Sequence, residues 1–382
     1  MGTEYSIQIS LPSVGDEEWH ALRDPLENGW LTQGPKVAEF ERVFAEKHQV
    51  EYSLATTSCT TALHLALVAL GIGPGDEVII PAFTWVATAN VVAYCGATPI
   101  FADVNPETYN IDVQDALRRV SSKTKVVIPV HLFGLCADVD LLREGLPGHV
   151  FILEDAACAA GAKYGNKFAG SLGDAAAFSF HPRKIITTGE GGMLLTHKGS
   201  IAEQANILRN HGASISEEQR HNGPHPYLMP DFNLLGFNYR MTDLQGAVGL
   251  VQLEKLERFI QERSQWAKWY REALKHIPWL KCPEEPKNGR HAWQAFVMFV
   301  HPDLAPMPRN DIMDILQSKG ISTRPGTHAV HMLKYYKEKY DFDAVDYPNA
   351  YDCDRNTMAI PLHNCMTDRD YQYIVETLES LS

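Results

Sequence analysis

Short apolar runs alternate with helical patterns between about residues 50 and 200. The runs are rich in Val, Ile and Phe, and their polarity does not strictly alternate, which indicates strands buried on both faces of a sheet. The candidate strands are Glu77–Ile80, Pro99–Asp103, Val126–Val130, Val150–Leu153, Ala176–Phe180 and Met193–Thr196. Between them, segments such as Thr60–Leu70 place apolar residues at helical spacing. This order predicts an α/β fold whose central sheet is mostly parallel and covered by helices.

The pattern changes after residue 210. Residues 211–235 are polar and rich in turn formers, which predicts a long surface excursion that could reach a partner subunit. Thr242 and Gln245 then fit a capping box at the start of a long helix, which we expect to continue to Ile277 and to end at Pro278. We therefore predict a large domain with an N-terminal arm over residues 1–255 and a smaller α+β domain over residues 256–382.

The composition of the chain argues against several classes of protein. The chain has 382 residues, and its 34 basic and 47 acidic side chains give a net charge of −13. That balance argues against nucleic-acid binding, which needs clustered basic residues. The seven cysteines are scattered without a C-x-x-C pair, so we expect neither disulfides nor a zinc site. No signal peptide or membrane-spanning run is evident, and we expect a soluble cytoplasmic protein.

Lys184 is the most informative single residue. It follows the small apolar run Ala175–Phe178 and precedes the glycine-rich turn Thr188–Gly192. A lysine on a short tether after a strand is a candidate Schiff-base nucleophile for an aldehyde cofactor. The alternative is an ordinary surface lysine, which is the common situation for this residue type.

An acidic pair, Glu154 and Asp155, ends another apolar run. Ligands of α/β proteins bind at the carboxyl ends of the strands. Asp155 is the candidate partner of a pyridine nitrogen, because the small Ala156 and Ala157 that follow it permit close approach, and Glu154 would then point elsewhere. A solvated pair of carboxylates at a strand end is the alternative.

Hydroxyl residues precede the helical pattern that starts near residue 60. The stretch Thr57–Leu63 is compatible with an anion site, since the first amides of a helix and its dipole attract phosphate. The alternative is a plain serine or threonine N-cap. Ser179 could also hydrogen-bond a phosphate. An aromatic after the strand at residues 77–80 could stack on a cofactor ring, although core packing is the favoured interpretation for Phe83.

Taken together, these motifs resemble the DegT/StrS family of sugar aminotransferases, which depend on pyridoxal 5′-phosphate and have the aspartate aminotransferase fold (fold type I). The resemblance covers nearly the whole chain. The matching stretches are GWLTQGPKVAEFE, ATTSCTTALHLALVALGIGPGDEVIIPAFTWVATAN, FADVNPETYNID, VHLFG, EDAACA, FSFHPRKIITTGEGGM, GFNYRMTDLQGAVGL and IPLH.

The resemblance implies a role for each matched residue. Lys184 would hold pyridoxal phosphate covalently, Asp155 would pair with the pyridine nitrogen, and Trp85 would stack on the ring. The phosphate would be bound by Thr60, Thr61 and Ser179, and by Asn238 of the neighbouring subunit. The last role implies a homodimer with shared sites. Cys158 stands where many members have Gln or His against the ring hydroxyl, and cysteine is a weak donor.

The resemblance also implies a reaction. We expect a ping-pong transfer of an amino group from L-glutamate to a keto group of a nucleotide-linked deoxy-sugar, in cell-surface polysaccharide or amino-sugar biosynthesis. Arg324 could bind a phosphate of that acceptor and His328 could face the sugar; a surface turn is the alternative. His328 and His331 have metal-like spacing, but no cluster joins them, so no metal is predicted.

Three other functions remain open at this point. The acceptor could be a small phosphorylated ketone or a cyclitol. The chain could be a non-catalytic regulator with this fold, although it keeps Lys184 and has no basic helical extension. A cysteine desulfurase would need a mobile nucleophilic cysteine, whereas Cys59 and Cys158 lie in motif segments that we expect to be ordered.

Overall fold

The computed structural model describes residues 6–213, 215, 223–225, 227 and 229–381. Its largest sheet has seven strands in the order β1-β10-β9-β6-β5-β2-β4. Neighbours from β9 to β4 run parallel, while β10 is antiparallel to both β9 and β1. The strands are β1 (Tyr52–Thr56), β2 (Glu77–Pro81), β4 (Thr98–Ala102), β5 (Thr124–Val127), β6 (Phe151–Asp155), β9 (Ala175–Ser179) and β10 (Gly192–Thr196). The predicted mostly parallel α/β sheet is confirmed, with β1 as an additional strand.

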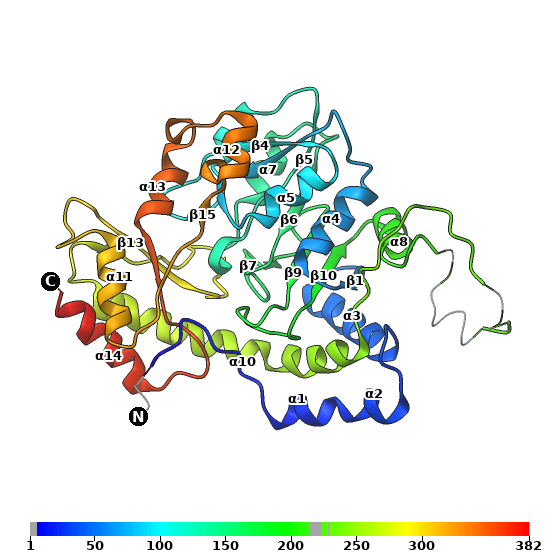
Figure 1. Cartoon of the computed structure of the whole chain (residues 1–382), viewed down its shortest axis with the longest axis horizontal. Coiled ribbons are helices and arrows are strands. Elements are labelled where there is room, and N and C mark those ends of the chain that lie inside the picture. The colour runs from blue at the N-terminus through cyan, green and yellow to red at the C-terminus, as the bar shows by residue number, and fades with distance from the viewer. Residues whose placement is uncertain (1–5, 214, 216–222, 226, 228, 382) are drawn as a thin grey trace.

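Helices cover both faces of this sheet (Figure 1). Along β9, Ala175 and Ala177 pack into one hydrophobic cluster, while Ala176 and Phe178 pack into another on the opposite face. The two-sided burial explains why the apolar runs do not alternate in polarity. The surrounding helices are α3 (Pro35–His48), α4 (Cys59–Ala69), α5 (Ala87–Tyr94), α6 (Val113–Arg118), η1 (Leu132–Gly134), α7 (Val139–Gly145) and α8 (Gly199–Leu208).

A second sheet of four strands forms from the last third of the chain. Its order is β11-β13-β16-β14, and its core includes residues of α11 and α14 such as Leu316 and Leu378. Ile7, near the start of the chain, bridges to Ile321 and joins the same core. The elements are β11 (Leu280–Lys281), β13 (Phe296–Val300), α11 (Arg309–Ser318), β14 (Arg324–Pro325), β16 (Thr357–Ile360) and α14 (Asp368–Glu379).

One long helix, α10 (Asp243–Leu274), runs past both sheets (Figure 1). The predicted capping box is confirmed, since the Thr242 hydroxyl accepts from the Gln245 amide and Gln245 reaches back to Thr242. The predicted end at Ile277 is wrong. The helix ends at Leu274, and the chain then turns with the Ile277 amide donating to the Leu274 carbonyl. The short helices α1 (Asp16–Ala21) and α2 (Arg23–Asn28) pack on α10.

Several small elements connect the two sheets. Strand β15 (His328–Ala329) pairs with β3 (Phe83–Thr84), and β12 (Gly289–Arg290) pairs with β7 (Lys163–Tyr164) of the hairpin completed by β8 (Lys167–Phe168). Helical segments late in the chain pack back on the core of the seven-stranded sheet through residues such as Tyr336 and Tyr347. These segments are η2 (Val330–Met332), α12 (Lys334–Tyr340), η3 (Ala344–Asp346) and α13 (Pro348–Asn356).

The predicted excursion at residues 211–235 leaves the body beyond α8 (Figure 1). Its two ends are held together by bridges between Asn210 and Asn238 and between Ala213 and Phe232. Met229 and Leu235 are exposed. The parts of the prediction that concern residues 214, 216–222, 226 and 228 lie outside the described residues. Among the described helices, none is long and apolar enough to cross a membrane.

Candidate functional site

A cavity of about 370 Å³ lies where β6 and β9 end and α4 begins, and we call it the lysine cavity. Strand carboxyl ends are where an α/β sheet leaves room for a ligand. Seven of the predicted site residues line it: Thr60, Trp85, Asp155, Cys158, Ser179, Lys184 and Arg324. Thr61, Asn238 and His328 are outside that lining. The cavity therefore lies between the seven-stranded sheet and the four-stranded sheet, which contributes residues of β13, β14 and β16.

Lys184 occupies the turn that follows β9. Its amide donates to the His181 carbonyl, and its Nζ lies 3.2 Å from the Cys158 Sγ. Burial disfavours the charged amine, but the hydrogen bond to the Cys158 sulfur and the charge of Asp155 outweigh this and raise the pKa of Lys184. The surface-lysine alternative is wrong, because the amine points into a cavity and contacts another predicted site residue.

Asp155 is buried at the end of β6 and held by three donors. The Thr88 hydroxyl donates to Oδ2 at 2.8 Å, and the Ala157 amide donates to Oδ1 at 3.2 Å. The Cys59 thiol lies 3.8 Å from Oδ1. Burial raises the pKa of Cys59, so its thiol stays protonated and can donate. These contacts fix the orientation of a carboxylate that lines the lysine cavity.

Glu154 points to the other side of β6, as predicted. Its oxygens accept from His131 Nε2 at 2.7 Å and from the amides of Gly170, Leu172 and Gly173. His131 Nδ1 accepts from the Ala137 amide, so Nε2 carries the proton and donates. Glu154 and His131 are fully buried. The alternative of two solvated carboxylates is therefore wrong.

The start of α4 forms the anion-attracting end of the cavity. Ser58 is the N-cap and accepts from the Thr61 amide, so the simple capping interpretation is correct for Ser58. The Thr61 hydroxyl completes the capping box by accepting from the Ser58 amide at 3.0 Å. Thr60 and Ser179 face the lysine cavity. Gly192 permits this arrangement, because a Cβ there would meet the Ser58 backbone at 2.3 Å.

The two aromatic residues after β2 have different surroundings. Phe83 is fully buried, which confirms its predicted core role, whereas Trp85 is 59% exposed and lines the cavity. The Trp85 ring lies 5.7 Å from the His328 ring, with an interplanar angle of 37°. His331 is buried instead, and its ring nitrogens lack hydrogen-bond partners among the described residues. No metal-binding group of three or more His, Cys, Asp or Glu side chains occurs within the described residues.

Several residues that complete the site were not predicted from the sequence. Thr88 and Cys59 hold Asp155, and Arg183 and Gln294 line the cavity. Both Thr88 and Cys59 lie inside a stretch that carried the family resemblance. The resemblance gave no sign that their side chains contact Asp155. No local signal marks Gln294, which reaches the cavity from the segment that precedes β13 and donates to the Arg183 carbonyl at 2.9 Å.

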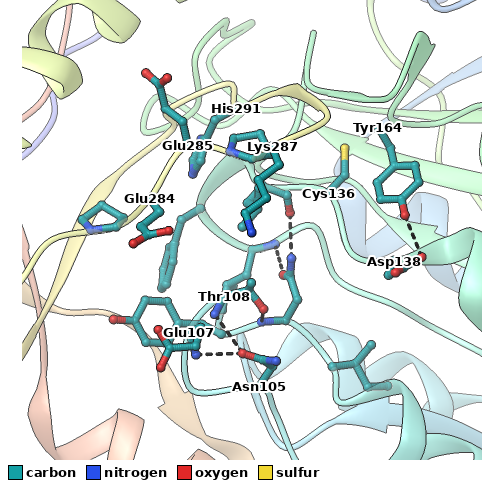
Figure 2. Close-up of a pocket in the computed structure, with 18 of the residues that line it drawn as sticks. Asn105, Glu107, Thr108, Cys136, Asp138, Tyr164, Glu284, Glu285, Lys287 and His291 are labelled. Atoms are coloured by element: carbon teal, nitrogen blue, oxygen red, sulfur yellow. Dashed lines mark hydrogen bonds between the residues drawn. The ribbon is translucent and has the colours of Figure 1, made fainter.

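A second cavity, of about 600 Å³, lies between residues 105–114 and 281–288. Figure 2 shows its mixed lining, in which Tyr164 donates to Asp138 and Asn105 accepts from the amides of Glu107 and Thr108. None of the predicted site residues lines it. It shares a wall with the lysine cavity, formed by Leu132, Phe133, Ala295 and Val297. The larger cavity therefore lacks the nucleophile that defines the candidate active site.

The residues of the lysine cavity fit pyridoxal phosphate. The cofactor needs an amine for its aldehyde, a carboxylate for its ring nitrogen and amide or hydroxyl donors for its phosphate. Lys184 supplies the amine, Asp155 the held carboxylate, and the start of α4 with Thr60 and Ser179 the donors.

Comparison with known proteins agrees with this fit. Residues 12–379 match the model of the DegT/DnrJ/EryC1/StrS aminotransferase family. The chain is 39% identical to the spore coat polysaccharide biosynthesis protein SpsC of Bacillus subtilis, over 98% of this chain and 97% of that protein. It is 35% identical to GDP-perosamine synthase of Caulobacter vibrioides, over 98% of both.

Solved structures show the same architecture. The PLP form of Spr1654 from Streptococcus pneumoniae superposes with a TM-score of 0.91 at 29% identity, and the match covers 99% of this chain and 98% of that one. Family model, relatives and structure therefore agree over nearly the full length. The chain belongs to the DegT/DnrJ/EryC1/StrS aminotransferase family and is a transaminase whose cofactor is pyridoxal 5′-phosphate.

Proposed function

We propose that this enzyme transfers an amino group from L-glutamate to a keto group of a nucleotide-linked deoxy-sugar, in the biosynthesis of a surface polysaccharide or amino sugar. Relatives named for spore coat polysaccharide and for GDP-perosamine support this choice of acceptor. The observation that carries the proposal is the contact of the Lys184 amine with Cys158, in the cavity that also contains Asp155 and Arg324.

Lys184 moves protons in this reaction. When bound, pyridoxal phosphate supplies an electron sink that makes a substrate C–H bond acidic. The Lys184 Nζ accepts that proton and returns it at a neighbouring carbon, as general base and then general acid. Asp155 holds a proton on the ring nitrogen, and Thr88 with the Ala157 amide keeps its carboxylate in place.

The remaining predicted roles are part of the proposal. Thr60, Thr61 and Ser179 bind the phosphate; Thr61 does so through its place in the first turn of α4, because its hydroxyl caps the helix. Trp85 stacks on the ring and Cys158 lies beside the ring hydroxyl. Arg324 binds a phosphate of the acceptor, and His328, in contact with Trp85, faces the sugar.

We also propose a homodimer with shared sites. Asn238 is exposed in the single chain and its backbone is fixed by a bridge to Asn210. Exposed apolar side chains on the same excursion, including Met229 and Leu235, suit burial against a partner. Sedimentation of the purified protein tests this point, because a monomer with full activity would contradict the shared sites.

The decisive experiment is the visible absorbance of the purified protein before and after L-glutamate is added. We expect the wild type to convert to the pyridoxamine form and Lys184→Ala to convert at least about 10³-fold more slowly, since the mobile base is absent. Lys167→Ala is the matched control, because Lys167 is an exposed lysine paired with Asp140. Loss of conversion in the control alone would contradict the role of Lys184.

The acceptor needs a separate measurement. After conversion by glutamate, the enzyme is offered a nucleotide-linked keto-deoxy-sugar, a small phosphorylated ketone or a keto-cyclitol, and the aminated product is identified by mass spectrometry. We expect the return of the original absorbance with the nucleotide-linked sugar. Return with the phosphorylated ketone or the cyclitol alone would replace the proposed acceptor.

A further inference from the structure

Two arginines from distant parts of the chain line the lysine cavity. Arg183 directly precedes Lys184, and Arg324 belongs to β14 of the four-stranded sheet. The backbone of each is fixed: the Arg183 carbonyl accepts from Gln294 Nε2 at 2.9 Å, and Arg324 pairs with Ala359 in the ladder of β14 and β16. Both guanidinium groups are thus attached to ordered backbone beside the reacting lysine.

Neither guanidinium forms a hydrogen bond or ion pair with any residue in the described part of the chain. Arg183 is exposed and Arg324 half-buried, whereas the buried arginines Arg209 and Arg263 are engaged by the protein. Arg209 pairs with Glu41 at 2.5 Å, and Arg263 donates to the carbonyls of Trp293 and Leu362. Two arginines that line one cavity without protein acceptors leave up to ten N–H donors for a ligand or for water.

The charges around these arginines are predominantly positive. The acidic residues in the lining of the lysine cavity are Asp155, which is held by Thr88, and Glu190, which lies 4.0 Å from His181. Burial and the charge of Arg183 together lower the pKa of Arg324. Two like charges at such a site repel each other, and an anion placed between them would offset that repulsion.

We propose that Arg183 and Arg324 form one anion subsite that the two substrates use in turn. It takes a carboxylate of the amino donor in the first half-reaction and a phosphate oxygen of the acceptor in the second. This inference rests on the proposed function, in which both substrates are anionic and enter the same cavity of about 370 Å³. The planar guanidinium fork matches the oxygens of carboxylates and phosphates alike.

The test measures binding rather than turnover. Glutarate, a dicarboxylate without an amino group, and inorganic pyrophosphate are titrated calorimetrically into the cofactor-loaded enzyme, whose own phosphate site is filled. We expect each probe to bind about tenfold more weakly to Arg183→Gln and to Arg324→Gln, and about a hundredfold more weakly to the double variant. The two probes should also compete with each other.

Matched variants separate charge from folding. Arg42→Gln changes an exposed arginine on α3 and should bind both probes like the wild type. Arg183→Lys and Arg324→Lys keep the charge without the fork and should bind with intermediate affinity. If a Gln variant fails to fold, the Lys variants still provide the comparison. Unchanged binding in the double variant, or loss of only one of the two probes, would overturn the shared subsite.

The same samples distinguish the subsite from the proposed function. Probe binding that depends on both arginines supports the subsite even if L-glutamate leaves the wild-type absorbance unchanged. In that case the amino donor, and not the anion subsite, would be wrong. Conversion by L-glutamate that is equally fast in the double variant and in the wild type would overturn the use of the subsite by the donor.

Discussion

Two regions meet at the end of β6 and differ in almost every respect. Asp155 lines the lysine cavity, with Thr88, Cys59 and one backbone amide as its donors. Its neighbour Glu154 is enclosed on the opposite face by His131 and three backbone amides. We call these the cavity side and the support side. Consecutive carboxylates thus acquire different tasks, because strand geometry turns them to opposite faces.

The difference teaches that acidity alone does not mark a functional carboxylate. On the support side every oxygen is used by the fold, so Glu154 stabilises the loop at residues 170–173 and orients His131. On the cavity side the donors hold Asp155 while it still faces open space. A carboxylate that is held but not enclosed is available to a ligand.

We expect the largest effect on the rate of conversion from a substitution of Asp155 on the cavity side. Asp155→Asn should slow conversion by L-glutamate by about 10²–10⁴-fold, because the amide no longer stabilises a proton on the ring nitrogen. Its melting temperature should stay near that of the wild type, since the side chain remains nearly the same size. Rate and melting curve are measured on one preparation. A large loss of stability with normal activity would show that Asp155 has a structural role like that of Glu154.

The reverse result is expected for Glu154→Gln. The amide places N–H groups against backbone donors, so the free energy of unfolding should fall by about 3 kcal/mol. Activity per folded molecule should change little. Denaturant titration followed by absorbance with L-glutamate measures both quantities. A folded variant of normal stability that fails to convert would contradict the proposed division.

Part of the acid sensitivity should arise on the support side, although burial also lowers the pKa of His331 and of His363 to about 4 elsewhere in the molecule. His48 is fully buried on the support side, and burial lowers its pKa to about 4 from the ordinary 6.5. The unfolded chain therefore binds a proton between these values that the folded chain does not, and stability falls as the pH drops from 6.5 toward 4. The slope for one group is about 1.4 kcal/mol per pH unit. His48→Leu should reduce the slope by the contribution of one group, whereas an unchanged slope would assign the sensitivity to the other buried histidines.

The smallest effect concerns the partner of Asp155. Thr88→Val keeps the shape of the side chain but removes the donor that lies 2.8 Å from Oδ2. We expect about tenfold slower conversion by L-glutamate, the value of one hydrogen bond to a charged group. Thr88→Ser retains the hydroxyl and should convert at nearly the wild-type rate. Equal conversion rates for Thr88→Val and Thr88→Ser would show that the Thr88 hydroxyl does not support the function of Asp155.

Much of the site was predictable because its chemistry lies at strand ends. Asp155 ends β6 and Lys184 follows β9, and both positions are visible as polar residues after apolar runs. The contacts between side chains of the site were harder to predict from the sequence. Thr88 is 67 residues from Asp155 in the chain, so their meeting depends on how α5 packs and on no local pattern. Arg183 carried no signal of its own beside Lys184.

Most of the fold was also predictable from local sequence patterns. All six predicted strands overlap observed strands, since two-sided burial produces continuous apolar runs. Strand β1, Tyr52–Thr56, was missed because its residues mix polar and apolar side chains over a short length. The end of α10 was missed because Pro278 is a strong stop signal, whereas the turn after Leu274 is stabilised by the burial of Ile277 and Trp279 in the smaller core.

The short pairing of β15 with β3 has a mechanical consequence. His328 lies opposite Thr84, one residue before Trp85, and Ala329 lies opposite Phe83. Arg324 lies four residues before this ladder. Backbone pairing therefore joins the segment that carries Arg324 to the segment that carries Trp85, and we expect a shift of one segment to be transmitted to the other.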